Sequence, residues 1–166
     1  MKNLCGIDEA GRGPLAGPMV VAGVILEKDI LGLNDSKVLS EKKREKLFDE
    51  IKEKSKYHIV FKSAKEIDDF GISFCLKSSI LEIMEQLQKF SNNFLMDGNT
   101  NFGIQNLKKE IKADAKYAQV SAASILAKVS RDRFMNEISS KYPNYNFQKH
   151  KGYGTKAHIE VIREFG

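Results

Sequence analysis

Apolar residues along this chain gather into short runs that are separated by polar stretches. The clearest strand candidates are residues 4–8 and 19–26, and the second is almost wholly apolar, as expected of a strand covered on both faces. Further strands are predicted over 57–61, 94–97 and 109–114. Because helical segments alternate with these strands, the pattern favours one α/β or α+β domain over residues 1–166.

Helical spacing of apolar residues occupies much of the remaining chain. Ser40 is suited to cap a helix at its N-terminus, and Ser63 with Glu66 forms the S-x-x-E pattern of a capping box. Pro143 ends a long helix that is rich in small residues. The expected helices cover 41–55, a short segment from 64, a segment from after Gly71 to 89, 115–140, and a last segment that ends near 165.

Composition indicates the partner and the cellular compartment of this protein, but not the reaction it carries out. Lys and Arg number 27 against 22 Asp and Glu, which gives a net charge of +5, and a positive excess suits a polyanionic partner. Cys5 and Cys75 lie in apolar contexts without zinc-ligand spacing. The first residues reach a charge too early for a signal peptide, and no apolar run approaches the roughly 20 residues of a membrane span. We therefore expect a cytoplasmic protein with no membrane association.

Carboxylates at strand ends carry the chemical signal. Asp8 and Glu9 end the first strand, and Asp97 ends the fourth. If these strands are parallel neighbours, Asp8 and Asp97 lie side by side, whereas Glu9 joins them only if the strand breaks its alternation near Gly11. Clustered carboxylates repel one another, and a hard divalent cation such as Mg²⁺ removes that cost. Two such ions roughly 4 Å apart can activate a water and stabilise the leaving oxygen of a phosphodiester.

Each acidic residue also has a structural interpretation. Asp97 with Gly98 is a common turn after a strand, and Asp8 with Glu9 can cap a loop. Asp114 is a fourth candidate ligand, or else an N-cap of the following helix. Asp132 competes with it, although its position between two arginines favours a structural ion pair.

Gly11, Arg12 and Gly13 follow the first acids and offer close backbone approach and a planar donor for phosphate. No P-loop sequence is present, which argues against a nucleoside triphosphatase. Tyr153, between two glycines, can stack on a base or sugar, or can plug the core. His158 is interpreted as a helix-face residue. Candidate phosphate contacts are Lys37, Lys149, His150 and Lys151.

Together these segments resemble the ribonuclease HII family over positions 6 to 155, in the family's order. The related ribonuclease HIII group shows a different stretch after the first acids. The matching stretches are GIDEAGRGPLAGP from Gly6, NDSK from Asn34, MDG from Met96, KAD from Lys112, SAASILAKVSRD from Ser121 and HKGYGT from His150.

The resemblance implies a ribonuclease H-like fold, a central mixed five-stranded sheet flanked by helices. It implies a quartet of catalytic metal ligands, Asp8, Glu9, Asp97 and Asp114, which favours Asp114 over Asp132. It also implies that the family loop reads the ribose 2′-hydroxyl through backbone groups and that the family tyrosine packs on the sugar. The implied substrate contacts are Gly11, Arg12, Gly13, Ser36, Lys37 and Tyr153.

The expected activity is that of an endonuclease using two Mg²⁺ or Mn²⁺ ions. We expect it to act on RNA–DNA hybrids and on single ribonucleotides in duplex DNA, as in ribonucleotide excision repair. Cleavage on the 5′ side of the ribonucleotide would leave a 3′-hydroxyl and a 5′-phosphate. Family members usually continue past the last helix, whereas this chain stops at Gly166, and we expect the core site to be complete without that stretch. A monomer is expected.

Two other classes of function remain open from sequence. One is a non-catalytic nucleic-acid-binding module that uses the same basic surface. The acid set disfavours it, because a binder gains nothing from carboxylates beside phosphates. The other is a metal-dependent phosphohydrolase of small molecules, which would need neither Tyr153 nor the basic tail.

Overall fold

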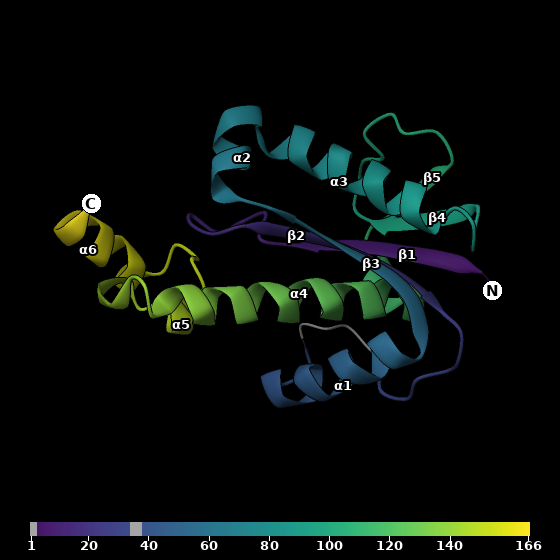
Figure 1. The fold of residues 1–166 in the computed structure, drawn as a ribbon, viewed down its shortest axis with the longest axis horizontal. Helices are drawn as coiled ribbons and strands as arrows, with labels where there is room; N and C mark the ends of the chain where they lie inside the picture. The colour runs from purple at the N-terminus through teal and green to yellow at the C-terminus, as the bar shows by residue number, and fades with distance from the viewer. Residues whose placement is uncertain (1–2, 34–37) are drawn as a thin grey trace.

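A computed structural model describes residues 3–33 and 38–166 and shows a twisted central sheet between two layers of helices (Figure 1). The sheet has five strands in the order β3-β2-β1-β4-β5. β2 pairs antiparallel with both β1 and β3, whereas β4 pairs in parallel with both β1 and β5. The expected mixed five-stranded sheet flanked by helices is thus confirmed. The strands are β1 (Leu4–Ala10), β2 (Met19–Leu26), β3 (Ser55–Lys62), β4 (Asn93–Asp97) and β5 (Leu107–Glu110).

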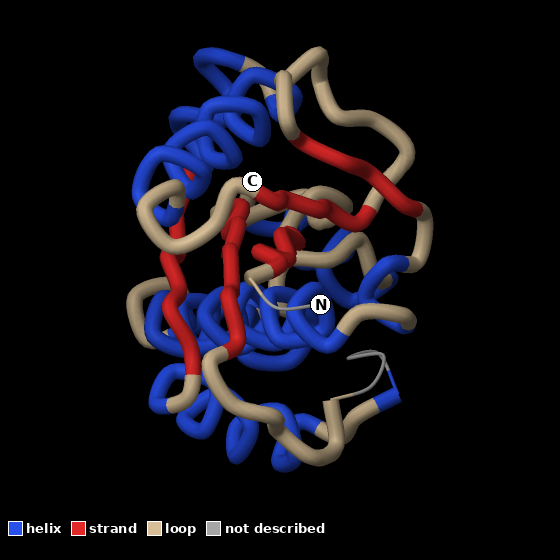
Figure 2. The backbone as a smooth tube through the Cα atoms, turned by 90° about the vertical axis from the view of Figure 1, so that its right-hand side faces the viewer, coloured by secondary structure: helices blue, strands red, loops and turns tan. Residues whose placement is uncertain are grey.

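Helices cover both faces of this sheet, as the end-on view of the strands also shows (Figure 2). On one face α3 packs against β2 and β3, and on the other α4 packs against β1 and β2 with α1 beside it. Each face has its own apolar core. The helices are α1 (Glu41–Glu53), α2 (Ala64–Phe70), α3 (Ile72–Leu87), α4 (Ala118–Ser139), α5 (Phe147–His150) and α6 (Lys156–Phe165), with short 3₁₀ turns η2 (Ala113–Ala115) and η3 (Pro143–Tyr145).

Local signals in the sequence determine where several of these helices begin. The Ser40 hydroxyl accepts a hydrogen bond from the Lys43 backbone N–H at the start of α1. At α2 the capping box is complete, because Ser63 and Glu66 each accept from the other's backbone N–H. Both expected caps are therefore confirmed.

The segment around Asp114 differs from expectation. β5 ends at Glu110 rather than extending over 109–114, and Asp114 lies in the turn η2. Lys112 adopts a left-handed conformation, with φ of 58°, which ends the extended chain before Ala113. The N-cap interpretation of Asp114 is also wrong, since Tyr117 occupies that position of α4.

α4 lies unusually close to β1. A Cβ on Gly6 would stand 2.3 Å from the Gln119 carbonyl carbon, so no side chain fits there without moving the helix. The helix also carries buried alanines where it faces the sheet, at Ala122, Ala123 and Ala127. Small residues on both elements therefore allow the helix to approach the strand that carries Asp8. Within the described chain, no helix combines the length and the apolar character needed to cross a membrane.

We expect Gly6→Ala to destabilise the fold by about 2 kcal/mol, because the added methyl group must displace backbone atoms of α4. Urea unfolding followed by circular dichroism measures this change. Gly13→Ala is the matched control, since a Cβ there meets nothing within 4 Å. Equal stability of the two variants would contradict the close contact.

Candidate active site

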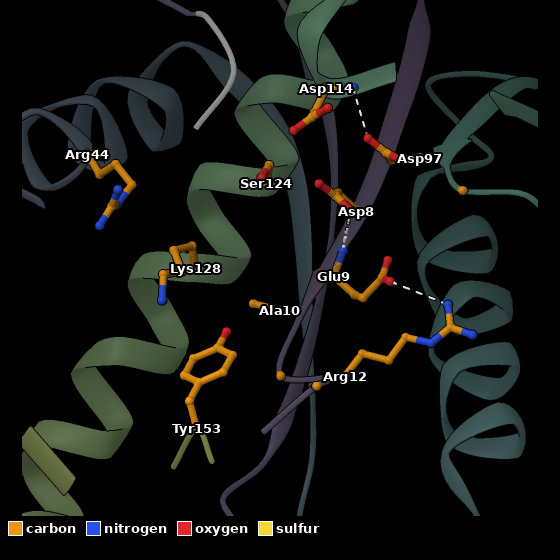
Figure 3. A pocket seen from close by; sticks show the side chains of 13 residues that line it. Asp8, Glu9, Ala10, Arg12, Arg44, Asp97, Asp114, Ser124, Lys128 and Tyr153 are labelled. Carbon is orange, nitrogen blue, oxygen red and sulfur yellow. Dashed lines mark hydrogen bonds and ion pairs between the residues drawn. The ribbon is translucent and has the colours of Figure 1, made fainter. Parts of the chain in front are cut away.

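A pocket of about 490 Å³ opens where β1 and β4 end (Figure 3). Carboxylates occupy one side of it, and α4 and Tyr153 form the opposite wall. The loop after β1 contributes the remaining wall. The lining residues are Asp8, Glu9, Ala10, Gly11, Arg12, Gly13, Arg44, Asp97, Gly98, Asp114, Ser124, Lys128 and Tyr153.

Three carboxylates meet in this pocket because of strand register. Ile7 pairs with Met96 at the last step of the parallel ladder, so the next residues, Asp8 and Asp97, lie side by side on adjacent strands. Asp114 joins them from η2, and its backbone N–H donates to Asp97 Oδ2 over 3.1 Å. One carboxylate oxygen from each of Asp8, Asp97 and Asp114 lies within 4.8 Å of the others. Residues from three segments thus offer oxygen ligands to a common point.

Glu9 is not part of this trio, although it lines the same pocket and interacts with Asp8. β1 keeps its ladder with β2 as far as Ala10, so Glu9 reaches the pocket without the break in alternation that was expected. The side chain points toward Arg12, whose Nη1 lies 3.8 Å from Glu9 Oε1 (Figure 3). Glu9 Oε2 is buried and accepts no hydrogen bond from the described residues. An unused acceptor at the edge of the acidic pocket is suited to a cation or a water that a cation orders.

Electrostatics in the pocket favour a positive ligand. Burial, followed by the charge of Glu9, raises the pKa of Asp8 well above its usual range, although a hydrogen bond from the Glu9 N–H opposes the shift. Burial also raises the pKa of Glu9, against the opposing effect of Arg12. Close carboxylates with oxygen ligands on several sides form the donor set that Mg²⁺ and Mn²⁺ prefer. The residues present therefore fit hard divalent ions.

Sequence reasoning missed three residues that face the pocket: Ser124, Lys128 and Arg44. The Ser124 hydroxyl hydrogen-bonds to Asp8, and Lys128 Nζ lies 5.5 Å from the centre of the Tyr153 ring. A signal for two of them existed, because Ser124 and Lys128 are four residues apart on one face of a helical stretch, Val120 to Val129, that is otherwise mostly apolar. No comparable signal marked Arg44.

The ion pair expected of Asp132 exists, but not with the neighbouring arginines. Lys128 Nζ lies 3.0 Å from Asp132 Oδ1, one turn back along α4. Arg133 pairs with Glu45 of α1, and Arg131 is directed elsewhere.

The candidate substrate contacts fall into three groups. Gly11, Arg12, Gly13 and Tyr153 line the pocket, and Tyr153 is 37% exposed, so its ring does not plug the core. Ser36 and Lys37 lie outside the described residues. His150 is buried with both ring nitrogens engaged by backbone groups, which removes it from the phosphate contacts.

A mixed sheet of this order, with a carboxylate cluster at the ends of its central strands, defines the class of metal-dependent nucleases with the ribonuclease H-like fold. The family model for ribonuclease HII matches residues 5–166, and this chain belongs to the ribonuclease HII family.

Individual relatives agree with this assignment. Ribonuclease HII of Aliarcobacter butzleri is 86% identical over all of this chain and 86% of the relative. That of Sulfurovum sp. is 56% identical over 99% of this chain and 86% of the relative. Among solved structures, ribonuclease HII of Archaeoglobus fulgidus, in its complex with PCNA, superposes with a TM-score of 0.86 at 31% identity, covering 98% of this chain and 88% of that chain.

We expect Mg²⁺ or Mn²⁺ to stabilise the folded protein, by about 2.7 kcal/mol when the free metal is at a hundredfold excess over its Kd. Asp8→Asn should abolish most of this gain. In EDTA, however, the same variant should be more stable than wild type at neutral pH. The raised pKa of Asp8 means that its ionisation costs stability as the pH rises above the ordinary value of 3.8.

Thermal unfolding with and without metal measures both effects. Asp68→Asn, at an exposed position on α2, is the control and should behave as wild type. An equal metal-induced shift in Asp8→Asn and wild type would exclude Asp8 as a ligand.

Proposed function

We propose that this chain is an endonuclease that cuts the RNA strand of RNA–DNA hybrids and single ribonucleotides embedded in duplex DNA. Cleavage falls on the 5′ side of the ribonucleotide and leaves a 3′-hydroxyl and a 5′-phosphate. The observation that carries this proposal is one pocket in which a carboxylate cluster faces the loop of Gly11 to Gly13 and an exposed Tyr153 ring. Membership of the ribonuclease HII family supports it.

The four acids Asp8, Glu9, Asp97 and Asp114 would hold two Mg²⁺ or Mn²⁺ ions. When bound, such ions lower the pKa of an attacking water and stabilise the leaving 3′-oxygen. Asp8 is the residue best placed to contact both, because its carboxylate lies between Glu9 and the other two acids (Figure 3). The Ser124 hydroxyl and the Glu9 N–H each donate to Asp8, which fixes the carboxylate before substrate arrives.

Recognition of the ribonucleotide is assigned to the opposite side of the pocket. Backbone groups of Gly11 and Gly13 are open to the pocket, which suits hydrogen bonds to a 2′-hydroxyl, the group that separates RNA from DNA. The Tyr153 ring packs on the sugar. Arg12 and Lys128 supply positive charge at the rim for the flanking phosphates. We propose that one domain, acting as a monomer, contains this whole site.

We expect Asp8→Asn to lower kcat by about a thousandfold or more, because the ligand common to both ions loses its charge. The assay uses a labelled duplex with one embedded ribonucleotide, with Mg²⁺, with Mn²⁺ and with EDTA. An all-DNA duplex and a small phosphate monoester are the substrate controls, and Asp68→Asn is the protein control. Hydrolysis of the monoester without cleavage of the duplex would favour a small-molecule phosphohydrolase.

We expect Tyr153→Ala to reduce kcat/KM on the single-ribonucleotide duplex by about tenfold to a hundredfold, the range of a lost stacking contact. Tyr153→Phe should retain most activity, because the ring rather than the hydroxyl contacts the sugar. Metal-induced thermal stabilisation should be unchanged in both variants. Full activity of Tyr153→Ala on this duplex would remove the residue from sugar recognition.

A further inference from the structure

Two buried histidines stack directly below the loop that carries Tyr153. The imidazoles of His150 and His158 are parallel within 13°, and their centroids are 4.0 Å apart. The ring of Phe147 meets both of them edge-on, at 5.6 and 5.8 Å. His158 is 1% exposed and His150 is 9% exposed, so neither ring serves as a surface contact for substrate.

The hydrogen bonds of these two rings engage backbone groups, at Gly152, Tyr153 and Tyr145. His158 Nδ1 donates to the Tyr153 carbonyl over 2.9 Å. His150 Nδ1 accepts from the Gly152 N–H over 3.1 Å, and its Nε2 donates to the Tyr145 carbonyl over 2.5 Å. The Tyr153 N–H in turn donates to the His150 carbonyl over 2.9 Å. The peptide groups on both sides of the Tyr153 Cα are thereby held by the histidine pair.

The same loop is tied to the segment that follows the first acids. The Gly152 carbonyl accepts from the Leu15 N–H over 2.8 Å, and a Cβ on Gly152 would lie 2.2 Å from the Ala16 carbonyl oxygen. Gly152 has a φ of 87°, which only glycine adopts without strain. Arg131, fully buried, donates to the carbonyls of Ala16 and Lys151. The backbone that carries the Tyr153 ring is therefore held in place, and Lys128 and Arg131 lie 5.5 Å from the centre of the ring itself.

From this geometry we propose that His150 and His158 are positioning residues, which hold the Tyr153 ring in the pocket through hydrogen bonds to the backbone around it. The proposal rests on the proposed contact between Tyr153 and the sugar. Neither histidine touches substrate, and each acts through the backbone of Tyr153. The two differ in one respect, because only His150 uses a ring nitrogen as an acceptor.

We call the hydrogen bonds from His150 and His158 to the backbone around Tyr153 the histidine clamp. Acid weakens this clamp through His150. A proton on His150 Nδ1 removes the acceptor of the Gly152 N–H, whereas protonated His158 still donates to Tyr153. Burial, and then the neighbouring His158, lower the pKa of His150 below its ordinary 6.5. His150 is harder to protonate in the closed loop than it would be in an open loop. The stability that His150 gives the closed loop is therefore complete above about pH 6.5 and is lost as the pH falls through the lowered pKa.

Other charges around the stack act in the same direction or lie at the surface. The buried cation nearest to the loop is Arg131, which disfavours a second positive charge. The charged side chains of α6 are exposed. On α4, which packs against α5, the buried Asp132 is paired with Lys128 and Arg133 is paired with Glu45. The remaining ionisable groups on the elements around the pair are Glu137, Tyr142, Tyr145, Lys149, Lys151, Tyr153, Lys156, Glu160, Arg163 and Glu164.

The chain has no tryptophan, so Tyr153→Trp places a single fluorescent reporter at the loop. We expect acrylamide quenching of this reporter to increase as the pH falls from about 8 to about 5, with a midpoint below 6.5. Adding His150→Asn, which keeps an acceptor for the Gly152 N–H but does not titrate, should remove the pH dependence. The third histidine, His58, pairs with Glu82, away from this loop in the sequence. His58→Asn should therefore leave the pH dependence of quenching unchanged.

Steady-state kinetics provide a second test of the positioning role. His158→Phe keeps a ring for the stack but deletes the donor to Tyr153, so we expect kcat/KM on the single-ribonucleotide duplex to fall about tenfold. In a Tyr153→Ala background the same substitution should have no further effect, because a positioning residue has nothing left to position. Metal-induced thermal stabilisation should be unaffected.

The outcomes separate the clamp from the proposed function. Quenching that is independent of pH and of His150→Asn, together with a harmful Tyr153→Ala, would overturn the clamp alone. A harmless Tyr153→Ala would overturn the sugar contact, and with it the positioning role. Fully additive losses in the double variant would assign His158 a general structural role instead. The pH series on Tyr153→Trp, with and without His150→Asn, does not use His158→Phe, so it tests the proposal even if that variant fails to fold.

Discussion

The parallel pairing of β1 with β4 is the constraint on which the rest of this structure depends. These strands are separated by α1, α2, α3 and two antiparallel strands in sequence, yet their register sets Asp8 beside Asp97 at one edge of the sheet. A shift of one residue would turn Asp8 to the other face and bury a carboxylate in apolar packing. The main-chain hydrogen bonds between β1 and β4 therefore determine where the proposed catalytic carboxylates lie.

This arrangement concentrates negative charge at the cost of stability. Burial raises the pKa of both Asp8 and Glu9, and the charges of Glu9 and Asp97 add to the effect on Asp8. The core clusters on both faces of the sheet provide the stabilisation that offsets this cost. Such a site is poorly satisfied without a cation, which is the property expected of a pocket that binds metal as part of its function.

The sequence predicted most elements of the fold, because each has a local signal. Caps at Ser40 and Ser63 and the apolar run of β2 act over a few residues and do not depend on tertiary contacts. The predicted end of β5 is wrong because Lys112 adopts a left-handed conformation, which a lysine side chain gives no reason to expect. Asp8, Glu9 and Asp97 were identified as candidates from their strand ends, whereas the choice of Asp114 needed the family resemblance. That Glu9 reaches the pocket from an unbroken strand could not be predicted, because only the ladder with β2 shows that the alternation continues to Ala10.

α4 connects the two halves of the proposed reaction. One end of the helix lies against Gly6 of β1, Ser124 bonds to Asp8 a turn later, and Lys128 and Arg131 flank the Tyr153 ring further along. A rise of 1.5 Å per residue in a helix fixes the spacing between the acids and the tyrosine, because neither end can move without the other. Loops alone would leave that distance variable, and a small misplacement of the sugar relative to the acids costs rate. The small residues that let α4 approach the sheet therefore serve catalytic geometry as well as packing, and the buried histidines extend the same rigidity to the loop beyond the helix.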